Sequence, residues 1–165
     1  MSKLQILKHD EIMLKLGRIA WQILEEFYES KNIVIIGIKS RGTAVAKLIE
    51  TKLAQISKAE IEFIEFTIDK DKALTTTIEW SDEINLKGKA VVLVDDVLNS
   101  GITLAGALKE ILSKEPKSVK VAVLANRDHK AFPIHADFVG ISLATTLKEH
   151  ISLVRENGNM AVYLV

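Results

Sequence analysis

Residues 91–103, VVLVDDVLNSGIT, constrain the fold of this chain more than any other stretch. The four apolar residues at its start are typical of a strand that is buried on both faces of a parallel sheet. Asp95 and Asp96 come where we expect that strand to end, and residues 104–112 have the apolar spacing of a helix. The stretch therefore predicts a buried strand, a loop rich in hydroxyl groups and glycine, and a helix.

The loop between that strand and that helix is expected to bind an anion. Backbone N–H groups at a helix N-terminus and the helix dipole favour a phosphate there, and Ser100 and Thr103 add two hydroxyl donors. The carboxylates of Asp95 and Asp96 would repel a phosphate unless a neutral group lay between them. A sugar phosphate meets both requirements, because its hydroxyls can donate to the carboxylates while its phosphate enters the loop.

Length and composition predict one ordinary globular domain, residues 1–165, which can bury roughly 70% of its unfolded surface. The 22 basic and 22 acidic residues cancel, which disfavours nucleic acid or an anionic membrane as a partner of the whole chain. The chain has no cysteine, so disulfides, thiolate catalysis and cysteine-ligated zinc are excluded. Because no segment resembles a signal peptide or a membrane span, we expect a cytoplasmic protein with no membrane contact.

A second strand, loop and helix precede this motif. Residues 33–38 predict a buried strand and residues 43–56 an amphipathic helix. The loop between them, GIKSRG, has the glycine spacing of a Walker A loop, but Thr43 stands where that loop needs its lysine. Lys39 and Arg41 are fixed cations beside a helix start, and this combination suits a pyrophosphate.

The remaining segments complete an α/β pattern. Residues 10–29 predict a helix capped by Asp10, with Trp21 at the edge of the core rather than on a partner surface. Strands that alternate with helices predict a twisted, mainly parallel sheet with helices on both faces. The polar segment 69–83 comes where an active-site lid would lie. Further strands are predicted at 60–68, 75–80, 118–125, 137–141, 151–154 and 160–165.

These motifs resemble those of the type I phosphoribosyltransferases, which bind phosphoribosyl pyrophosphate (PRPP). The resemblance implies that family's α/β fold, a twisted, mainly parallel sheet flanked by helices with a small hood. It also implies Mg²⁺, which is expected to reach the site with PRPP and for which Asp95 is the one candidate protein ligand. It assigns PRPP to Lys39, Ser40, Arg41, Gly42, Asp95, Asp96, Val97, Leu98, Asn99, Ser100, Gly101, Ile102 and Thr103.

Within that family the chain resembles the PyrR group, which are uracil phosphoribosyltransferases and, in some bacteria, RNA-binding attenuators of the pyrimidine operon. The shared stretches are LGRIAWQI, GIKSRG, VVLVDDVLNSGIT and VAVLANRDHKAFPIHADFVG. The resemblance places Arg127 and Ile151 beside the nucleobase and implies a dimer or tetramer. The catalytic roles then fall to Asp95, Asp96, Arg41 and Lys70.

The chain also departs from the PyrR pattern. An Asp-Lys-Asp run replaces Tyr-Arg-Asp at the lid, so Lys70 keeps the charge but lacks the bidentate guanidinium. Asn126 and His135 stand where an acid and an arginine are usual, which leaves the base preference open. Gly17 and Trp21 replace a threonine and a histidine of the RNA-binding members, which disfavours an RNA surface.

The sequence therefore predicts Mg²⁺-dependent transfer of the 5-phosphoribosyl group from PRPP to a nucleobase, most simply uracil, giving UMP and pyrophosphate. A purine transferase for hypoxanthine or guanine is an alternative, because the PRPP half of its site would be the same. A third reading is a non-catalytic binder, either a PRPP or nucleotide sensor or an RNA-binding regulator of pyrimidine genes. The altered lid is the best support for that reading.

Overall fold

The computed structural model describes residues 3–39, 41–75, 77–146 and 149–165. None of the helices in this part of the chain is long and apolar enough to cross a membrane. The elements in chain order are β1 (Leu4–Leu7), α1 (His9–Glu26), β2 (Asn32–Ile38), α2 (Arg41–Ile56), β3 (Glu60–Thr67), the 3₁₀ helix η1 (Lys70–Lys72), β4 (Glu79–Trp80), β5 (Ala90–Leu98), α3 (Ile102–Leu112), β6 (Ser118–Arg127), β7 (Phe138–Leu143), β8 (Ile151–Glu156) and β9 (Asn159–Leu164).

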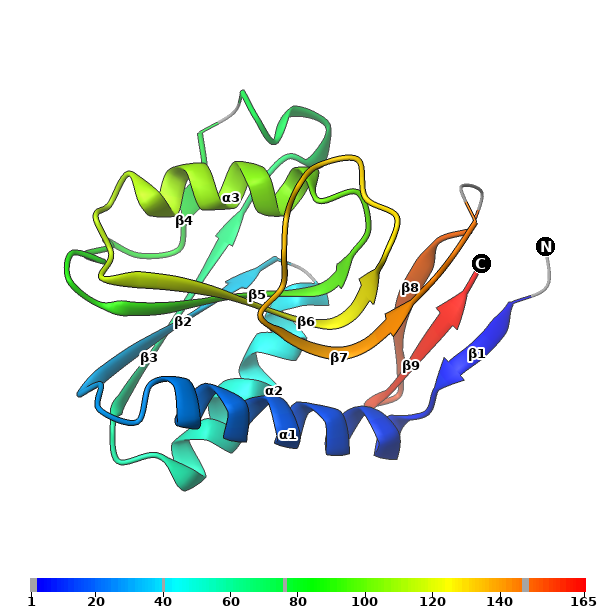
Figure 1. The fold of residues 1–165 in the computed structure, drawn as a ribbon, viewed down its shortest axis with the longest axis horizontal. Coiled ribbons are helices and arrows are strands. Elements are labelled where there is room, and N and C mark those ends of the chain that lie inside the picture. Colours follow the sequence, from blue (N-terminus) through cyan, green and yellow to red (C-terminus); the bar gives the residue numbers. More distant parts are fainter. Residues whose placement is uncertain (1–2, 40, 76, 147–148) are drawn as a thin grey trace.

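A six-stranded sheet with the order β4-β3-β2-β5-β6-β7 forms the centre of the molecule. Its strands are parallel except for β4, which pairs with β3 in the antiparallel sense. Helices α1 and α2 cover one face and α3 covers the other (Figure 1). Every residue of β5 is buried, as expected for a central strand between two layers of helices. The predicted α/β fold is confirmed.

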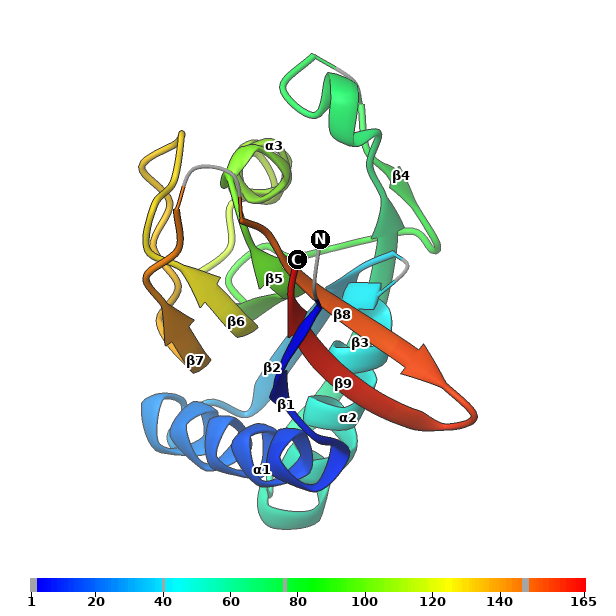
Figure 2. The same ribbon diagram turned by 90° about the vertical axis from the view of Figure 1, so that its right-hand side faces the viewer.

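A smaller antiparallel sheet, with the order β1-β9-β8, forms the hood. It lies beyond the carboxyl ends of β2, β5 and β6, which point toward it (Figures 1 and 2). Strand β1 has no counterpart in the sequence-based assignment, because four residues with only Leu7 buried leave too little periodicity to recognise. The turn between β8 and β9 falls at Asn157 and Gly158, as predicted.

Two predictions about α1 were wrong. The helix begins at His9, and its N-cap is Lys8 rather than Asp10; Glu11 Oε2 accepts a hydrogen bond from the N–H of Lys8 at 2.8 Å. Trp21 is 60% exposed rather than at the core edge. Its neighbour Ala20 is on the buried stripe of the helix, and one residue of helical rotation turns the indole toward solvent.

Several predicted boundaries also change. Helix α1 ends at Glu26 rather than at residue 29, and strands β6, β7 and β8 extend to Arg127, Leu143 and Glu156. Strand β5 does not end before Asp95 but continues to Leu98, because its pairing with β6 continues through Val97 and Ala125. Helix α2 begins at Arg41, so the cation belongs to its first turn. The predicted strand 75–80 shrinks to the two residues of β4, since the chain at Thr75 turns back to Lys72.

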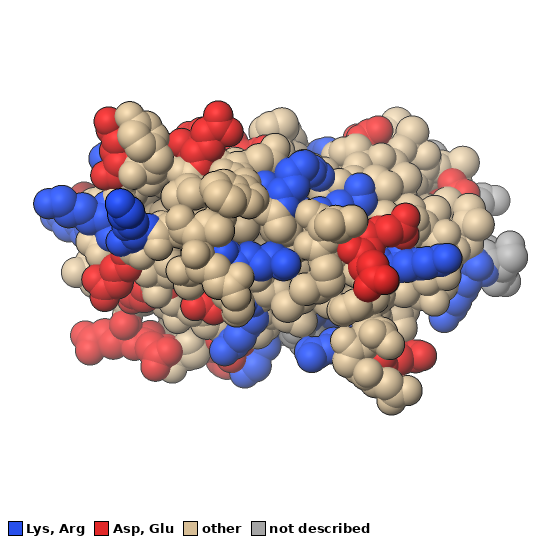
Figure 3. Space-filling model, turned by 90° about the horizontal axis from the view of Figure 1, so that it is seen from below, with Lys and Arg blue, Asp and Glu red and all other residues tan. Residues whose placement is uncertain are grey.

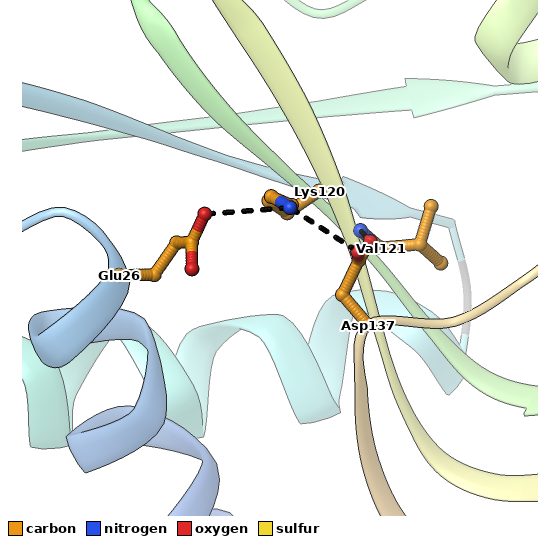
Figure 4. Close-up of polar contacts among 4 residues, drawn as sticks. All are labelled: Glu26, Lys120, Val121 and Asp137. Carbon is orange, nitrogen blue, oxygen red and sulfur yellow. Dashed lines mark hydrogen bonds and ion pairs between the residues drawn. The ribbon is translucent and has the colours of Figure 1, made fainter.

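An ion-pair cluster ties α1 to the amino ends of β6 and β7 (Figure 4). Lys120 Nζ lies 3.3 Å from Glu26 Oε1 and 3.4 Å from Asp137 Oδ1. The other carboxylate oxygen of Asp137 accepts the N–H of Val121 at 2.8 Å. The charge of Asp137 is the main cause that raises the pKa of Lys120, and the hydrogen bond with Glu26 adds to it. Elsewhere on the α1 and α2 side, acidic and basic side chains are interspersed (Figure 3).

Replacing Lys120 by methionine is expected to lower the melting temperature slightly, since each partly exposed ion pair is worth about 0.2–1 kcal/mol. The raised pKa means that the contribution is complete below the ordinary lysine pKa and is lost as the pH rises through the higher value in the folded state. The melting temperatures of the wild-type and Lys120→Met proteins should therefore become equal at high pH and in about 1 M salt. Lys117→Met, at an exposed position, is the control. A difference independent of both salt and pH would contradict this role.

Candidate active site

The two predicted motifs meet at one cavity of about 370 Å³, beside the carboxyl ends of β2 and β5. This is the edge at which ligands bind in open α/β sheets. The cavity is lined by Lys39, Arg41, Gly42, Lys70, Asp95, Asp96, Val97, Asn99 and Ile151. An adjoining cavity of about 300 Å³ is lined by Lys70, Asp71, Asp95, Val97, Leu98, Asn99, Ser100, Gly101, Ile102, Thr103 and Leu104.

The first turn of α2 packs directly against the acidic pair. A Cβ placed on Gly42 would lie 2.9 Å from Asp95 Oδ1 and 3.3 Å from the carbonyl oxygen of Val94. These distances leave no room for a side chain without a shift of Asp95 or its backbone. The absence of a side chain at Gly42 therefore lets the cationic loop come close to the carboxylates on β5.

Glu65 supports the cationic loop from β3, and the sequence did not single it out. The hydroxyl of Thr43 donates to Glu65 Oε2 at 2.9 Å, and Lys39 Nζ lies 3.9 Å from Glu65 Oε1. In the sheet Glu65 is the register partner of Gly37, the first residue of GIKSRG. Only the pairing of β2 with β3 reveals this neighbour, so a single sequence offers no direct signal for it.

Asp95 and Asp96 are buried, with exposed fractions of 5% and 7%. The Asp96 N–H donates to Asp95 Oδ1 at 2.9 Å. Burial raises the pKa of Asp95 well above its usual value, the charge of Asp96 adds to the rise, and Lys70 acts in the opposite direction. A carboxylate whose charged form is disfavoured by burial and by a neighbouring acid is stabilised when a ligand supplies hydrogen-bond donors or positive charge.

The oxygen atoms of the site suit a hard cation. Asn99 Oδ1 is buried and has no hydrogen-bond partner among the described residues, while its Nδ2 donates to the carbonyl of Ile151 at 3.4 Å. Asn99 lines the same cavity as Asp95 and Asp96, and all three side chains carry oxygen atoms that can bind a cation. No cluster of three or more acidic or histidine side chains occurs in the described part of the chain. Magnesium commonly takes one or two protein carboxylates and fills its shell with water and substrate oxygens, so the pair Asp95 and Asp96 meets its requirement.

The start of α3 opens onto the adjoining cavity. Gly101 is the N-cap in the left-handed region, with φ of 87°, and a Cβ there would lie 3.2 Å from Ile134. Ser100 Oγ accepts the N–H of Ile102 at 3.3 Å, and the Ser100 carbonyl accepts the N–H groups of Ala131 and Phe132. The segment after β6 therefore fixes the loop, and only glycine takes its conformation without strain.

The predicted lid lies against α3. Lys70 lines both cavities. A side chain on Gly106 would collide with the carbonyl of Ala73, and Lys109 Nζ donates to the carbonyl of Leu74 at 3.3 Å. The segment that carries Lys70 is thus docked beside the site in this structure.

The remaining predicted residues divide into three cases. Ile151 lines the first cavity. Arg127 lines neither cavity; it is 8% exposed, and its guanidinium donates to Thr145 Oγ1 and to the carbonyl of Thr146, both at 2.7 Å. Ser40 lies outside the described residues. Asp71 and Leu104 line the adjoining cavity and were not predicted.

Residues 2–155 match the phosphoribosyl transferase domain family. The chain belongs to this family. The bifunctional protein PyrR of Fusobacterium nucleatum is 38% identical over 156 residues, which cover 90% of this chain and 88% of that protein. The pyrimidine operon regulatory protein of Lactococcus lactis is 38% identical over 165 residues, 94% of each. The resemblance to the PyrR group is thereby confirmed.

Solved structures confirm the phosphoribosyltransferase fold. The hypoxanthine phosphoribosyltransferase of Trypanosoma cruzi superposes with a TM-score of 0.80 over 96% of this chain and 94% of that one, at 15% identity. The hypoxanthine-guanine phosphoribosyltransferase of Bacillus anthracis gives a TM-score of 0.72 over 90% and 86%, at 21% identity. At these identities the structural match shows the fold and not the substrate.

Proposed function

We propose that this phosphoribosyltransferase transfers the 5-phosphoribosyl group of PRPP to uracil, with release of pyrophosphate. The observation that carries the proposal is the contact between the two motifs at Gly42 and Asp95, which lets one ligand reach both. The cations Lys39 and Arg41 suit a pyrophosphate, the acids suit ribose hydroxyls, and the loop before α3 suits a phosphate. PRPP carries these three groups in that order.

The proposed reaction depends on position and charge. Because the bond to the leaving pyrophosphate breaks early, positive charge develops on the ribose and negative charge on the pyrophosphate. Lys39, Arg41 and Lys70 lie beside the leaving group, while Asp95 and Asp96 accept the ribose hydroxyls and stabilise the cationic ring. Closure of the segment that carries Lys70 would exclude the water that hydrolyses PRPP.

Magnesium would be held by Asp95 and Asp96, with Asn99 Oδ1 as a third oxygen donor. When bound, the ion supplies positive charge to the diphosphate and the ribose oxygens. Neither carboxylate has an ion-pair partner within 4.0 Å among the described residues, so the ion would add positive charge beside them.

Uracil is proposed as the acceptor because the relatives of this chain include a pyrimidine operon regulatory protein and several bifunctional PyrR proteins. Ile151 supplies an apolar wall to the cavity. Arg127 acts on the base through the backbone that it holds, since its guanidinium fixes Thr145 and Thr146 ahead of β8. Its proposed place beside the base therefore becomes a supporting one.

Pyrophosphate release tests the proposed reaction. Purified protein, PRPP and Mg²⁺ are incubated with uracil, hypoxanthine, guanine, xanthine or orotate, and with no base. The proposal expects release with uracil and formation of UMP. Turnover with a purine but not with uracil would contradict uracil as the acceptor and would leave the phosphoribosyl transfer reaction in place. Release of pyrophosphate in the absence of any base would contradict transfer to a base.

A second function, regulation by RNA binding, is favoured by the regulatory names of the relatives. Against it stand the zero net charge and the exposed Trp21 where RNA-binding members have a histidine. If no base is consumed while PRPP still raises the melting temperature, the regulator becomes the better account, and RNA from the leader of a pyrimidine operon is the next ligand to test.

A further inference from the structure

Glu65 lies near the carboxyl end of β3, beside the cationic loop, and the reaction proposed above gives it no part. Its carboxylate has two neighbours. Oε2 accepts the hydroxyl of Thr43 in the first turn of α2 at 2.9 Å, and Oε1 lies 3.9 Å from Lys39 Nζ in the loop. Within the described part of the chain, Glu65 is the only acid that forms an ion pair with a cation of the first cavity.

The position of Glu65 is fixed, whereas Lys39 is free to move its charge. Glu65 is the register partner of Gly37 in β2, and its carbonyl accepts the N–H of Ser81 at 3.1 Å. The side chain of Glu65 is 27% exposed and that of Lys39 is 57% exposed. Lysine carries a compact charge on a flexible stem. The ammonium group can therefore move toward a ligand while the carboxylate stays in place.

The absence of a side chain at Gly37 makes the contact between α2 and β3 possible. A Cβ there would lie 3.2 Å from Thr43 Cα and 3.0 Å from Ala46 Cβ. Helix α2 therefore packs closely enough onto β2 for Thr43 to reach the neighbouring strand β3. One carboxylate oxygen of Glu65 is thus occupied by a neutral donor, and the other faces the cation.

We propose that Glu65 is a positioning residue that acts through Lys39 and lowers the affinity of the site for pyrophosphate. A pyrophosphate bound at Lys39 must compete with Glu65 for the ammonium group and lies near a fixed negative charge. Arg41 has a neutral partner instead, since its Nη1 donates to Ser152 Oγ at 3.2 Å. The inference rests on the proposed function, because pyrophosphate is the leaving group of that reaction. Without the carboxylate, the cations of the site would hold this product more tightly and release it more slowly.

Glu65→Gln tests the role of the charge, because glutamine keeps an oxygen that can accept the Thr43 hydroxyl. The wild-type and variant proteins are titrated calorimetrically with pyrophosphate in Mg²⁺. We expect the variant to bind pyrophosphate roughly threefold more tightly or better, because the repulsion is removed. Structural damage would only weaken binding, so a gain of affinity separates the two explanations. The gain should shrink in about 1 M salt, which screens exposed charges.

Glu62→Gln is the matched control. Glu62 lies on the same strand, is partly buried like Glu65, and pairs with a lysine, Lys89, at 2.6 Å. Neither Glu62 nor Lys89 lines a cavity of the candidate active site. This substitution removes the same charge from the same strand and should leave the affinity for pyrophosphate unchanged.

Thr43→Val tests the hydroxyl that holds the carboxylate. Without this donor Glu65 can close on Lys39, so the variant should bind pyrophosphate more weakly than the wild-type protein does. The Thr43→Val/Glu65→Gln protein should bind it as tightly as Glu65→Gln alone, because the hydroxyl acts through the charge of Glu65.

Three results would overturn the proposal. The first is an affinity for pyrophosphate that is unchanged or lower in Glu65→Gln, and the second is an equal gain in Glu62→Gln. The third is a loss in Thr43→Val that persists in the double variant. Titration of the wild-type protein with PRPP separates these results from a failure of the proposed function. Binding of neither PRPP nor pyrophosphate would overturn both proposals, whereas binding of both with no effect of Glu65→Gln would contradict only the role of Glu65.

Discussion

Replacing Asp95 and Asp96 by asparagine is expected to abolish detectable PRPP binding without unfolding the protein. Hydrogen bonds to a charged acceptor contribute about 1.5–3 kcal/mol each, so losing two of them lowers affinity on the order of 100-fold or more. Asparagine has the size of aspartate, and its side-chain oxygen at position 95 can still accept the N–H of residue 96. Calorimetry with PRPP in Mg²⁺ measures the affinity, and circular dichroism checks the fold. Unchanged affinity would contradict the claim that Asp95 and Asp96 bind the ribose hydroxyls.

The single substitution Asp95→Asn should also make the ligand-free protein more stable at neutral pH. The folded state raises the pKa of Asp95, so it binds this proton more tightly than the unfolded chain does. Wild-type stability therefore falls as the pH rises from the ordinary aspartate pKa through the raised value. Asparagine removes this loss, so its advantage should be largest at neutral pH and vanish below about pH 4. Equal melting temperatures at neutral pH would show that the buried carboxylate costs no stability.

Gly42→Ala should impair PRPP use more than it impairs folding. Its methyl group would lie 2.9 Å from Asp95 Oδ1, so the carboxylate must move from the position that the ribose needs. Overpacking costs about 1–3 kcal/mol of stability, and a misplacement near 1 Å can cost roughly 100-fold in rate. Steady-state kinetics and thermal melts on the same preparation measure both effects.

Gly17→Ala is the matched control for this substitution. Gly17 lies inside α1, and nothing is within 4 Å of the place where its Cβ would be. Alanine there should leave kinetics unchanged and stabilise the helix by about 0.5–1 kcal/mol. If Gly42→Ala behaves like Gly17→Ala, the packing of α2 against the acidic pair has no role in the reaction.

The sequence predicts secondary structure best where the apolar pattern fits only one type of element. Strands β2 and β5 have such runs, and α2 has the apolar spacing of an amphipathic helix. Because the carboxyl ends of parallel strands share one edge, the meeting of the two motifs could be expected. Strand β1 could not, because only one of its four side chains is buried and its conformation depends on pairing with β9.

The errors at the site have a common physical cause. The contact of Glu65 with Thr43 depends on the register between β2 and β3, and the direction of Arg127 depends on the hydroxyl of Thr145 and the carbonyl of Thr146. Tertiary neighbours decide these two contacts, and no local pattern encodes them. Trp21 is a different case, since one residue of helical rotation separates the buried Ala20 from an indole that is 60% exposed.

The central claim is that both motifs bind parts of one ligand, and titration with that ligand and its two halves tests it most directly. Ribose 5-phosphate, pyrophosphate and PRPP are titrated separately into the wild-type protein in Mg²⁺. If the motifs share a site, PRPP binds much more tightly than either half, because joining the halves makes the second contact intramolecular. PRPP that binds no more tightly than ribose 5-phosphate would show that the GIKSRG loop does not take the pyrophosphate, and the account would fail.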